Sequence, residues 1–539
     1  MNIASRAGAL ALLAGIGAAH PAAAQDAGEA VIIVTGKDRP AEPLAYAGSV
    51  RAIGPQELEA RGFQDLSTLS YAAPNVSLDP IGTFRGVANF AIRGLGINSS
   101  IPSIDPAVGL FVDGVYIGIN AGTVLDALDV VQVDILRGPQ GAAFGRNTTG
   151  GAILVTTAAP AEAWEGSVRI GYEAPVDSGR GIGMVTARGS ISGPVADGVG
   201  LRLSALHSDD GGYFRNQFDA RPFGASETTV LRAALRAEPA GGLVLTGKGE
   251  WSQARGDGAP AHSNGLFARD TFEISVNQRG FHDSESGFAV LRAEARLGAG
   301  QLTSVTGWRA YDLATRNDID STPQAIFQSD TATRQRQWSN ETTYAFETGP
   351  ARVLGGFYRF GQEVAYEESR DLTGFGAPPQ FGGGTQDHDV TSLFAQVDVD
   401  LSPAVALKAG LRWSREEKRA AITYVRPRAA CSVLAGSCPV TGERVAGENN
   451  GFSDERAWEA FSPRVVASWR PAQTAQLYAS WSRGQRSGGY NLRITQPAAF
   501  EQIAATLGSP AFDEEQADSF ELGGKWETRG GALFVAGAL

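Results

Sequence analysis

The chain has 539 residues, a net charge of −12 at pH 7 and 43% hydrophobic residues. This length exceeds one ordinary domain, and the acidic balance, without any basic block, argues against a nucleic-acid partner. After the N-terminus, no apolar run is long enough for a transmembrane helix.

Residues 1–24 have the pattern of a cleaved export signal. Arg6 supplies a positive charge, Ala7 to Ala19 form a short apolar core, and Ala22-Ala23-Ala24 places small residues before Gln25. This core is too short, and its residues too small, for a membrane anchor. The pattern predicts that the mature protein leaves the cytoplasm.

A strongly strand-forming peptide, Glu29 to Gly36, follows the export signal. Its aliphatic residues have high strand propensity, and the surrounding segment is polar, Ala-rich and Pro-rich, with no core nearby in sequence. Two interpretations stay open: the first strand of the next domain, or a peptide that pairs as an added strand with the sheet edge of a partner. The residues concerned are Glu29, Val31, Ile32, Ile33, Val34 and Thr35.

Residues 48–158 predict a compact α+β domain. Its strands are expected at Ser49–Ile53, Phe90–Gly96, Val108–Gly118, Val130–Leu136 and Ala152–Thr157. Short helices are expected at Pro55–Arg61 and at Asp65–Tyr71, where Asp65 can act as the N-cap.

The densest pattern of this domain is LRGPQGAAFGRNTTGGAI, residues 136–153, a glycine-rich loop that leads into a strand. So many glycines in a short span indicate turns with positive φ or a close backbone approach. A phosphate-binding loop is excluded, because it needs Gly-Lys-[Ser/Thr] before a helix, whereas Gly145 is followed by Arg146-Asn147 and then a strand. Spacing alone predicts a tight strand-loop-strand unit.

From Trp164 onward, short segments of alternating polar and apolar residues recur between polar, Gly-rich loops, for example at 168–172, 393–401 and 407–414. Strands with one apolar and one polar face suit a transmembrane barrel, and a soluble sandwich has the same period. Frequent charges on the polar face, and tryptophans expected near strand ends, favour the membrane. These tryptophans are Trp308, Trp413, Trp469 and Trp481. Short connections alternate with long ones, as periplasmic turns and external loops do.

The residues that carry chemistry in other proteins are sparse here. Cys431 and Cys438 lie in one loop-like segment, and a close pair in an exported protein predicts a local disulfide. The five histidines are scattered singly and predict no metal site. Because no nucleophile, base or metal cluster accompanies the carboxylates, we expect neither an enzyme nor a cofactor.

Residues 136–153 resemble the end of the plug domain of TonB-dependent outer-membrane receptors. The matching positions are Leu136, Arg137, Gly138, Pro139, Gly141, Phe144, Gly145, Arg146, Asn147, Gly150 and Gly151, whereas Ala142 and Ala143 depart from the family's usual Thr-Leu. FAIRGLG, with Arg93 and Gly94, and VGLFVDGVYIG, with Asp113 and Gly114, carry further family patterns. Glu29–Gly36 resembles the family's TonB box, and GLRWSREEK (410–418) and SFELGGKW (519–526) resemble segments of its barrel.

The resemblance implies four regions: a signal peptide (1–24), a TonB-box segment and linker (25–47), a plug domain (48–158) and a partial transmembrane β-barrel (159–539) around the plug. It implies a receptor in the outer membrane of a Gram-negative bacterium, which imports a scarce ligand with energy from TonB. A ferric siderophore is the commonest cargo, and other small ligands are also carried. A passive porin or adhesin barrel is the alternative, although a porin needs no enclosed N-terminal domain.

The resemblance also assigns roles to polar residues of the plug. Ion pairs within the plug and with the barrel are expected for Arg93, Arg137, Arg146, Asp113, Asp126, Asp129 and Asp134. Ligand contacts are expected in two plug turns, around 80–89 and 98–106, at Thr83, Arg85, Asn98 and Asp105.

The number of strands falls short of the family's barrel. Roughly fifteen strand-like stretches follow Trp164, whereas plugged transporters of this kind close with about 22 strands. An open sheet edge is not tolerated in lipid. We therefore expect a fragment or a truncated product, with a smaller complete barrel as the alternative.

Overall fold

The computed structural model describes residues 44, 46–81, 86–122, 128–176, 181–268, 271–438, 450–528 and 533–539. The expected signal peptide and the peptide Glu29–Gly36 lie outside these residues. Within them, no helix combines the length and the apolar character that crossing a membrane requires.

The first part of the described chain is an α+β domain, which we call the N-terminal domain (residues 46–158). Its main sheet has the order β1-β7-β8-β5-β6, and only the β5–β8 pair is parallel. The strands are β1 (Val50–Ile53), β5 (Val108–Val112), β6 (Val115–Tyr116), β7 (Val130–Arg137) and β8 (Gly151–Thr157). The apolar face of helix α1 (Pro55–Ala60) and the 3-10 helix η1 (Leu66–Leu69) pack on this sheet, and Asp65 caps η1.

Two segments that the sequence predicts as single strands are hairpins. Phe90–Gly96 holds β3 (Ala91–Ile92) and β4 (Leu95–Gly96), which form a small sheet with β2 (Val76–Ser77), and Val108–Gly118 holds β5 and β6. Arg93 and Asp113 have φ angles of 55° and 48°, and each precedes a glycine with positive φ. Two successive positive φ angles make the tight turn of a hairpin, so the chain reverses within each run of strand-forming residues.

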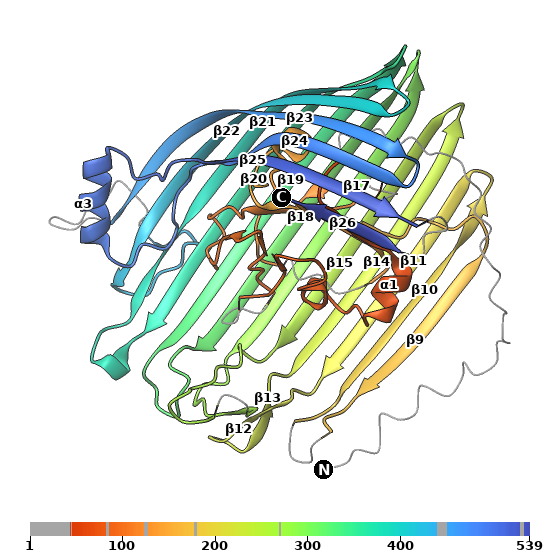
Figure 1. Cartoon of the computed structure of the whole chain (residues 1–539). Coiled ribbons are helices and arrows are strands. Elements are labelled where there is room, and N and C mark those ends of the chain that lie inside the picture. Colours follow the sequence, from red (N-terminus) through yellow and green to blue (C-terminus); the bar gives the residue numbers. More distant parts are fainter. Residues whose placement is uncertain are drawn as a thin grey trace. The chain divides into compact units, whose positions relative to one another are not determined.

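Most of the described residues after 158 form one antiparallel sheet of 15 strands, which agrees with the predicted number. Figure 1 shows this large sheet curving around the N-terminal domain. Its strands are β9 (Glu165–Glu173), β10 (Met184–Ala196), β11 (Val199–Asp210), β14 (Ser226–Ala240), β15 (Leu243–Gly256), β17 (Phe281–Leu297), β18 (Gly300–Asp318), β19 (Gln328–Thr348), β20 (Ala351–Asp371), β21 (Gln380–Ser402), β22 (Val405–Pro427), β23 (Gly451–Ala472), β24 (Ala475–Arg486), β25 (Glu515–Glu527) and β26 (Phe534–Ala538).

Small elements lie in the connections of the large sheet. They are β12 (Phe214–Asn216), β13 (Arg221–Phe223), β16 (Glu273–Ile274), η2 (Thr373–Phe375) and α3 (Pro497–Leu507). The connections at one end of the strands are short, such as 349–350 and 403–404, and those at the other end are long, such as 257–280 and 487–514. This agrees with the predicted alternation of short and long connections.

The two faces of the large sheet differ in composition. In β19, Gln335 and Gln337 are buried toward the N-terminal domain, while Arg336 and Trp338 are exposed. On the exposed face, Phe357, Leu393, Trp413 and Phe461 occupy one row across four paired strands. A row nearer the long connections joins Arg336, Glu363, Asp387 and Arg419. An apolar band therefore gives way to charge toward the long connections.

One detail of the predicted strands is wrong. Trp308, Trp413 and Trp481 lie inside β18, β22 and β24 rather than near strand ends; of the four predicted tryptophans, only Trp469 is close to one. The reason is strand length: β22 has 23 residues, whereas about 9–11 residues cross a bilayer. In β9, at the edge of the sheet, Val168, Ile170 and Tyr172 alternate with polar residues as predicted, and all residues of the strand are exposed.

Candidate functional site at the domain–sheet interface

The glycine-rich loop between β7 and β8 is pressed against the large sheet. It contains the single helical turn α2 (Gly141–Phe144), which ends at Gly145 with a φ of 79°. A Cβ on Gly145 would lie 2.7 Å from the Arg412 Nη1, and the Asn147 amide donates a 2.8 Å hydrogen bond to the Gln485 carbonyl. The glycines therefore permit the close backbone approach that the sequence predicts.

This loop brings Arg146 into a buried group of charges. Its Nη2 lies 2.7 Å from the Asp105 Oδ2 and its Nε lies 3.1 Å from the Glu416 Oε2. The Lys418 Nζ also lies 2.7 Å from the Asp105 Oδ2. Asp105 and Arg146 belong to the N-terminal domain, whereas Glu416 and Lys418 project inward from β22. These four side chains, which we call the ionic cluster, join the domain to the sheet.

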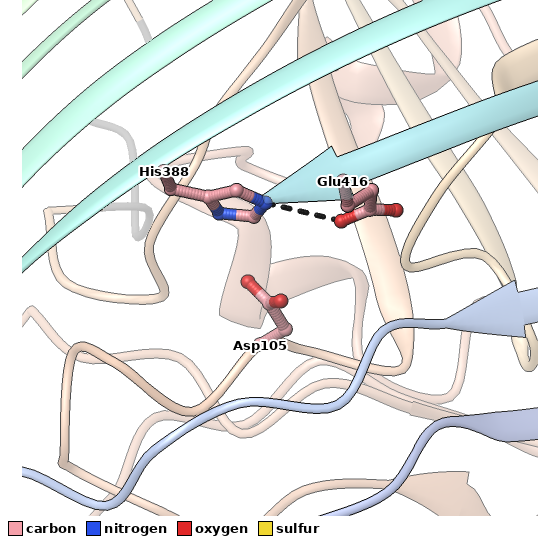
Figure 2. Close-up of side chains that lie close together, drawn as sticks. All are labelled: Asp105, His388 and Glu416. Carbon is pink, nitrogen blue, oxygen red and sulfur yellow. Dashed lines mark hydrogen bonds and ion pairs between the residues drawn. The ribbon is translucent and has the colours of Figure 1, made fainter. Parts of the chain in front are cut away.

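A histidine completes the surroundings of the ionic cluster. The His388 Nε2 on β21 lies 3.1 Å from the Glu416 Oε2, and Figure 2 shows Asp105 facing this pair from the N-terminal domain. Asp105, His388 and Glu416 offer three possible metal-ligand atoms within 4.8 Å of one another. The sequence did not predict this group of three residues, because they lie far apart in the chain and the histidines are scattered singly.

The charges in the ionic cluster favour a structural tie over a metal centre. Asp105 already contacts Arg146 and Lys418, and Glu416 already contacts Arg146. Two cations thus balance two carboxylates, and a divalent ion would have to displace a buried cation from its partner. The alternating pattern of β22 contained a clue, because Glu416 and Lys418 are two residues apart and must share a face.

Burial and charge oppose each other at Asp105 and Arg146. Burial alone would raise the pKa of Asp105, but Arg146 and Lys418 bring that pKa well below its usual range. Burial alone would lower the pKa of Arg146, but Asp105 and Glu416 raise it above its usual value. Both groups therefore stay charged near neutral pH, and the tie is ionic.

Further ion pairs attach the N-terminal domain around the sheet, as predicted for its charged residues. Arg93 pairs with Glu521 on β25, Asp113 lies 2.8 Å from the Lys248 Nζ on β15, and Asp129 lies 2.8 Å from the Arg202 Nε on β11.

The other three residues for which ion pairs were predicted are Arg137, Asp134 and Asp126. The Arg137 Nη1 donates to the Pro74 carbonyl at 3.2 Å, which is a hydrogen bond rather than an ion pair. Asp134 accepts a 2.7 Å hydrogen bond from the Gln132 Nε2. Asp126 lies outside the described residues.

The residues expected to contact ligand fall into three situations. Thr83 and Arg85 lie outside the described residues, and Asn98 is exposed. Asp105 is buried, and its carboxylate has two cationic partners in the ionic cluster. Ligand contact by these residues stays a prediction.

The long connection after β24 covers the turn that contains Asp105. The Leu492 amide donates to the Ser103 Oγ at 3.2 Å, and the Ser487 Oγ donates to Asp105 at 3.3 Å. Tyr490 and Leu492 are fully buried there.

In the connection after β22, Cys431 and Cys438 form a disulfide, which confirms the local disulfide predicted from the sequence.

Family models match both parts of the chain. The model described as the TonB-dependent Receptor Plug Domain matches residues 43–152. The model described as TonB dependent receptor-like, beta-barrel, matches residues 200–538. Residues 153–199 lie between the two matches, and they contain the passage from the N-terminal domain to the first strands of the large sheet.

Curated relatives match part of the chain. The pesticin receptor of Yersinia pestis is 27% identical over 214 residues, which is 39% of this chain and 30% of that receptor. The iron-regulated outer membrane virulence protein of Vibrio cholerae is 24% identical over 162 residues, 29% of this chain and 24% of that protein. The matched segments thus span less than a third of these relatives.

Solved structures share the fold over most of the chain. The ferric yersiniabactin uptake receptor FyuA from Yersinia pestis superposes with a TM-score of 0.74 at 17% identity, covering 92% of this chain and 72% of that one. The ferric citrate transporter FecA, in its unliganded form, gives a TM-score of 0.69 at 15% identity, covering 90% and 68%.

Proposed function

The chain belongs to the TonB-dependent receptors, and from that premise we propose that it imports a ferric chelate across the outer membrane with energy supplied by TonB. In this proposal, the N-terminal domain is the plug and the large sheet is the wall of the barrel. Transport receptors of this family carry out no chemical conversion, so the plug's charged groups act by holding and releasing it.

The ionic cluster is the observation that carries the energy-coupled proposal. The cluster buries Asp105, Arg146, Glu416 and Lys418 between plug and wall. Breaking one buried pair by removing a partner costs about 3–5 kcal/mol, and the plug has further ion pairs at β11, β15 and β25. Thermal opening would therefore be rare. An external pull on the plug is therefore needed to open a path for solute through the barrel. A passive porin needs no such pull.

TonB is proposed to pull on the peptide Glu29–Gly36. Its alternating aliphatic residues suit strand addition to the edge of a TonB sheet, in which backbone hydrogen bonds supply affinity. The preceding residues 1–24 are proposed to be the export signal, and the residues up to 47 the linker to the plug. This arrangement would place the pulled peptide on the periplasmic side.

Placement in the outer membrane is supported by the exposed face of the sheet. The row of Phe357, Leu393, Trp413 and Phe461 is apolar, as expected for residues against lipid. The charged row nearer the long connections would lie at the level of the lipid headgroups. The long connections would then face the outside and the short ones the periplasm.

A ferric chelate is proposed because iron recurs in the names of similar proteins. The structures include uptake receptors for ferric yersiniabactin and ferric citrate, and one curated relative is an iron-regulated outer membrane protein.

The test uses cells that lack other ferric receptors and express this protein. The probe is ⁵⁵Fe added to the culture supernatant of the iron-starved native host. We expect energy-dependent uptake, abolished by deleting residues 29–36 and by Ile32→Pro, because proline cannot pair in an added strand. Ile32→Val is the control and should retain uptake, and binding of ⁵⁵Fe to cells at 4 °C should survive in all variants. Full uptake by the deletion variant would refute the proposal.

A further inference from the structure

The plug is attached unevenly to the wall. On the side of β19–β25, its loops are bound by the ionic cluster and by the pair of Arg93 and Glu521. On the side of β14–β18, a cavity of about 500 Å³ lies between plug and wall, beside the packing of Val115 on Val290 and Val305. This size is within the range of pockets that hold small molecules, about 300–1,000 Å³.

Polar and apolar side chains both line the cavity. The wall contributes hydroxyls from Thr228, Ser252, Ser284 and Ser286, and the plug contributes apolar side chains such as Val112 and Ile117. Charged side chains also line it: Arg232 and Glu250, which form an ion pair, together with Asp65, Asp210 and Arg309. Such a surface offers hydrogen bonds and charges of both signs, which suits a polar solute.

An ion pair lies beside the cavity, toward the short connections. The Lys248 Nζ on β15 lies 2.8 Å from the Asp113 Oδ1 and 2.9 Å from the Thr157 carbonyl, and Thr157 lines the cavity. In the other direction the lining reaches Tyr213 and Pro260 in the long connections. The cavity thus extends from the long connections down to Thr157, which the Lys248 Nζ contacts.

We infer that solute passes between the plug and strands β14–β18, with the pair of Lys248 and Asp113 as the lower gate of this path. The inference rests on the proposed function and adds the route and the size of the solute, a polar molecule of a few hundred daltons. The physical reason is the asymmetry of the ties. Moving the plug off β14–β18 breaks one ion pair, the gate pair, together with the hydrogen bonds from Arg309 to the Ala121 and Gly122 carbonyls and the packing of Val115 on Val290 and Val305. Moving it off β22 instead breaks the ionic cluster, in which four charged side chains are buried.

The first test locks the plug to one side of the wall or to the other. A Cβ on Gly410 of β22 would lie 3.8 Å from the Ala142 Cβ, and one on Gly307 of β18 would lie 3.0 Å from the Val115 Cβ. Disulfides have Cβ–Cβ distances near 3.8 Å, so Ala142→Cys/Gly410→Cys fits directly and Val115→Cys/Gly307→Cys fits after a small shift. Each lock is opened by a reductant, which makes every variant its own control.

The oxidised lock at β18 should reduce ⁵⁵Fe uptake at least tenfold, and the reductant should restore it. The oxidised lock at β22 should leave at least half of the uptake. Loss of uptake in both locks would mean that the plug leaves the wall as a whole, and loss only in the β22 lock would place the path on that side. Either result, or full uptake in both locks, overturns the inference.

The second test needs no ferric chelate. Lys248→Met removes the gate cation, and we expect entry of nitrocefin, a chromogenic cephalosporin of a few hundred daltons, into porin-deficient cells to rise several-fold. Lys525→Met is the matched control, because the Lys525 Nζ binds the Tyr46 carbonyl on the side of β25. Equal entry in the two variants, or no rise in Lys248→Met, overturns the inference. If wild-type cells take up no ⁵⁵Fe, the proposed cargo fails while this test still decides the route.

Discussion

The Lys418 Nζ on β22 lies 2.7 Å from the Asp105 Oδ2 in the plug, and both side chains are buried. The same carboxylate oxygen lies 2.7 Å from the Arg146 Nη2. One plug carboxylate is thus shared by a cation of the plug and a cation of the wall. The charges of the plug and of the wall are paired with each other only while the plug is docked. The ionic cluster is therefore buried when the plug docks and exposed when it leaves.

Replacing Arg146 by Met should weaken plug docking by about 3–5 kcal/mol, because Asp105 and Glu416 lose their shared partner while staying buried. The measurement is guanidinium unfolding in detergent, followed by tryptic cleavage of the plug. The control is Arg169→Met, whose ion pair with Glu59 is 58% and 66% exposed and should contribute less than about 1 kcal/mol. Similar losses in both variants would contradict the role of the cluster.

Acid should loosen the plug only at low pH. Burial alone would raise the pKa of Asp105, but Arg146 and Lys418 lower it below its usual value. A carboxyl whose pKa is lowered on folding stabilises fully above its unfolded pKa, about 3.9 for Asp, and loses this effect as pH falls toward its folded pKa. The difference in melting temperature between wild type and Asp105→Asn should stay constant from pH 8 to about pH 5 and shrink below about pH 4. Shrinkage between pH 7 and 5 would disprove the assignment.

Replacing Gly151 by Ala should sharply reduce the yield of folded protein. Gly151 has a φ of 152°, and a Cβ there would lie 2.2 Å from the Leu136 carbonyl oxygen, so β7 and β8 would have to separate. Such overpacking costs about 1–3 kcal/mol or more. Folding is measured as the fraction of the protein that migrates on a denaturing gel as a band whose mobility changes on heating. Gly171→Ala in β9, where a Cβ meets nothing within 4 Å, should behave as wild type; equal yields would count against this explanation.

Removing the disulfide should affect only the connection after β22. The bond joins residues seven positions apart, and closing so short a loop stabilises by about 2–3 kcal/mol in the chain-entropy model. The double variant Cys431→Ser/Cys438→Ser should therefore be cleaved faster by protease around 428–438, with unchanged plug docking. A loss of plug docking in this variant would show that the loop supports the plug, contrary to this prediction.

Periodicity predicted much of the fold, and local backbone conformation accounts for the errors. The alternation from Trp164 onward predicts about the number of strands found, because a sheet with unlike faces leaves a period of two in the sequence. The hairpins at Arg93 and Asp113 were predicted as single strands. The reason is that a positive φ at a residue other than glycine does not change the alternation of polar and apolar residues. The tryptophans were wrongly predicted near strand ends. The strands continue beyond the apolar band, and how far they continue depends on hydrogen bonding to the neighbouring strands.

By itself, the sequence determined the α+β domain, the strand-rich remainder, the glycine loop and the nearby cysteine pair, because these features depend on residues close together in the chain. It also placed Glu416 and Lys418 on one face of one strand. Only the tertiary structure decided that Lys418 meets Asp105, 313 residues away, and that His388 stands beside Glu416. Those contacts depend on sheet register and on how the plug is seated, which are properties of the whole fold rather than of any segment.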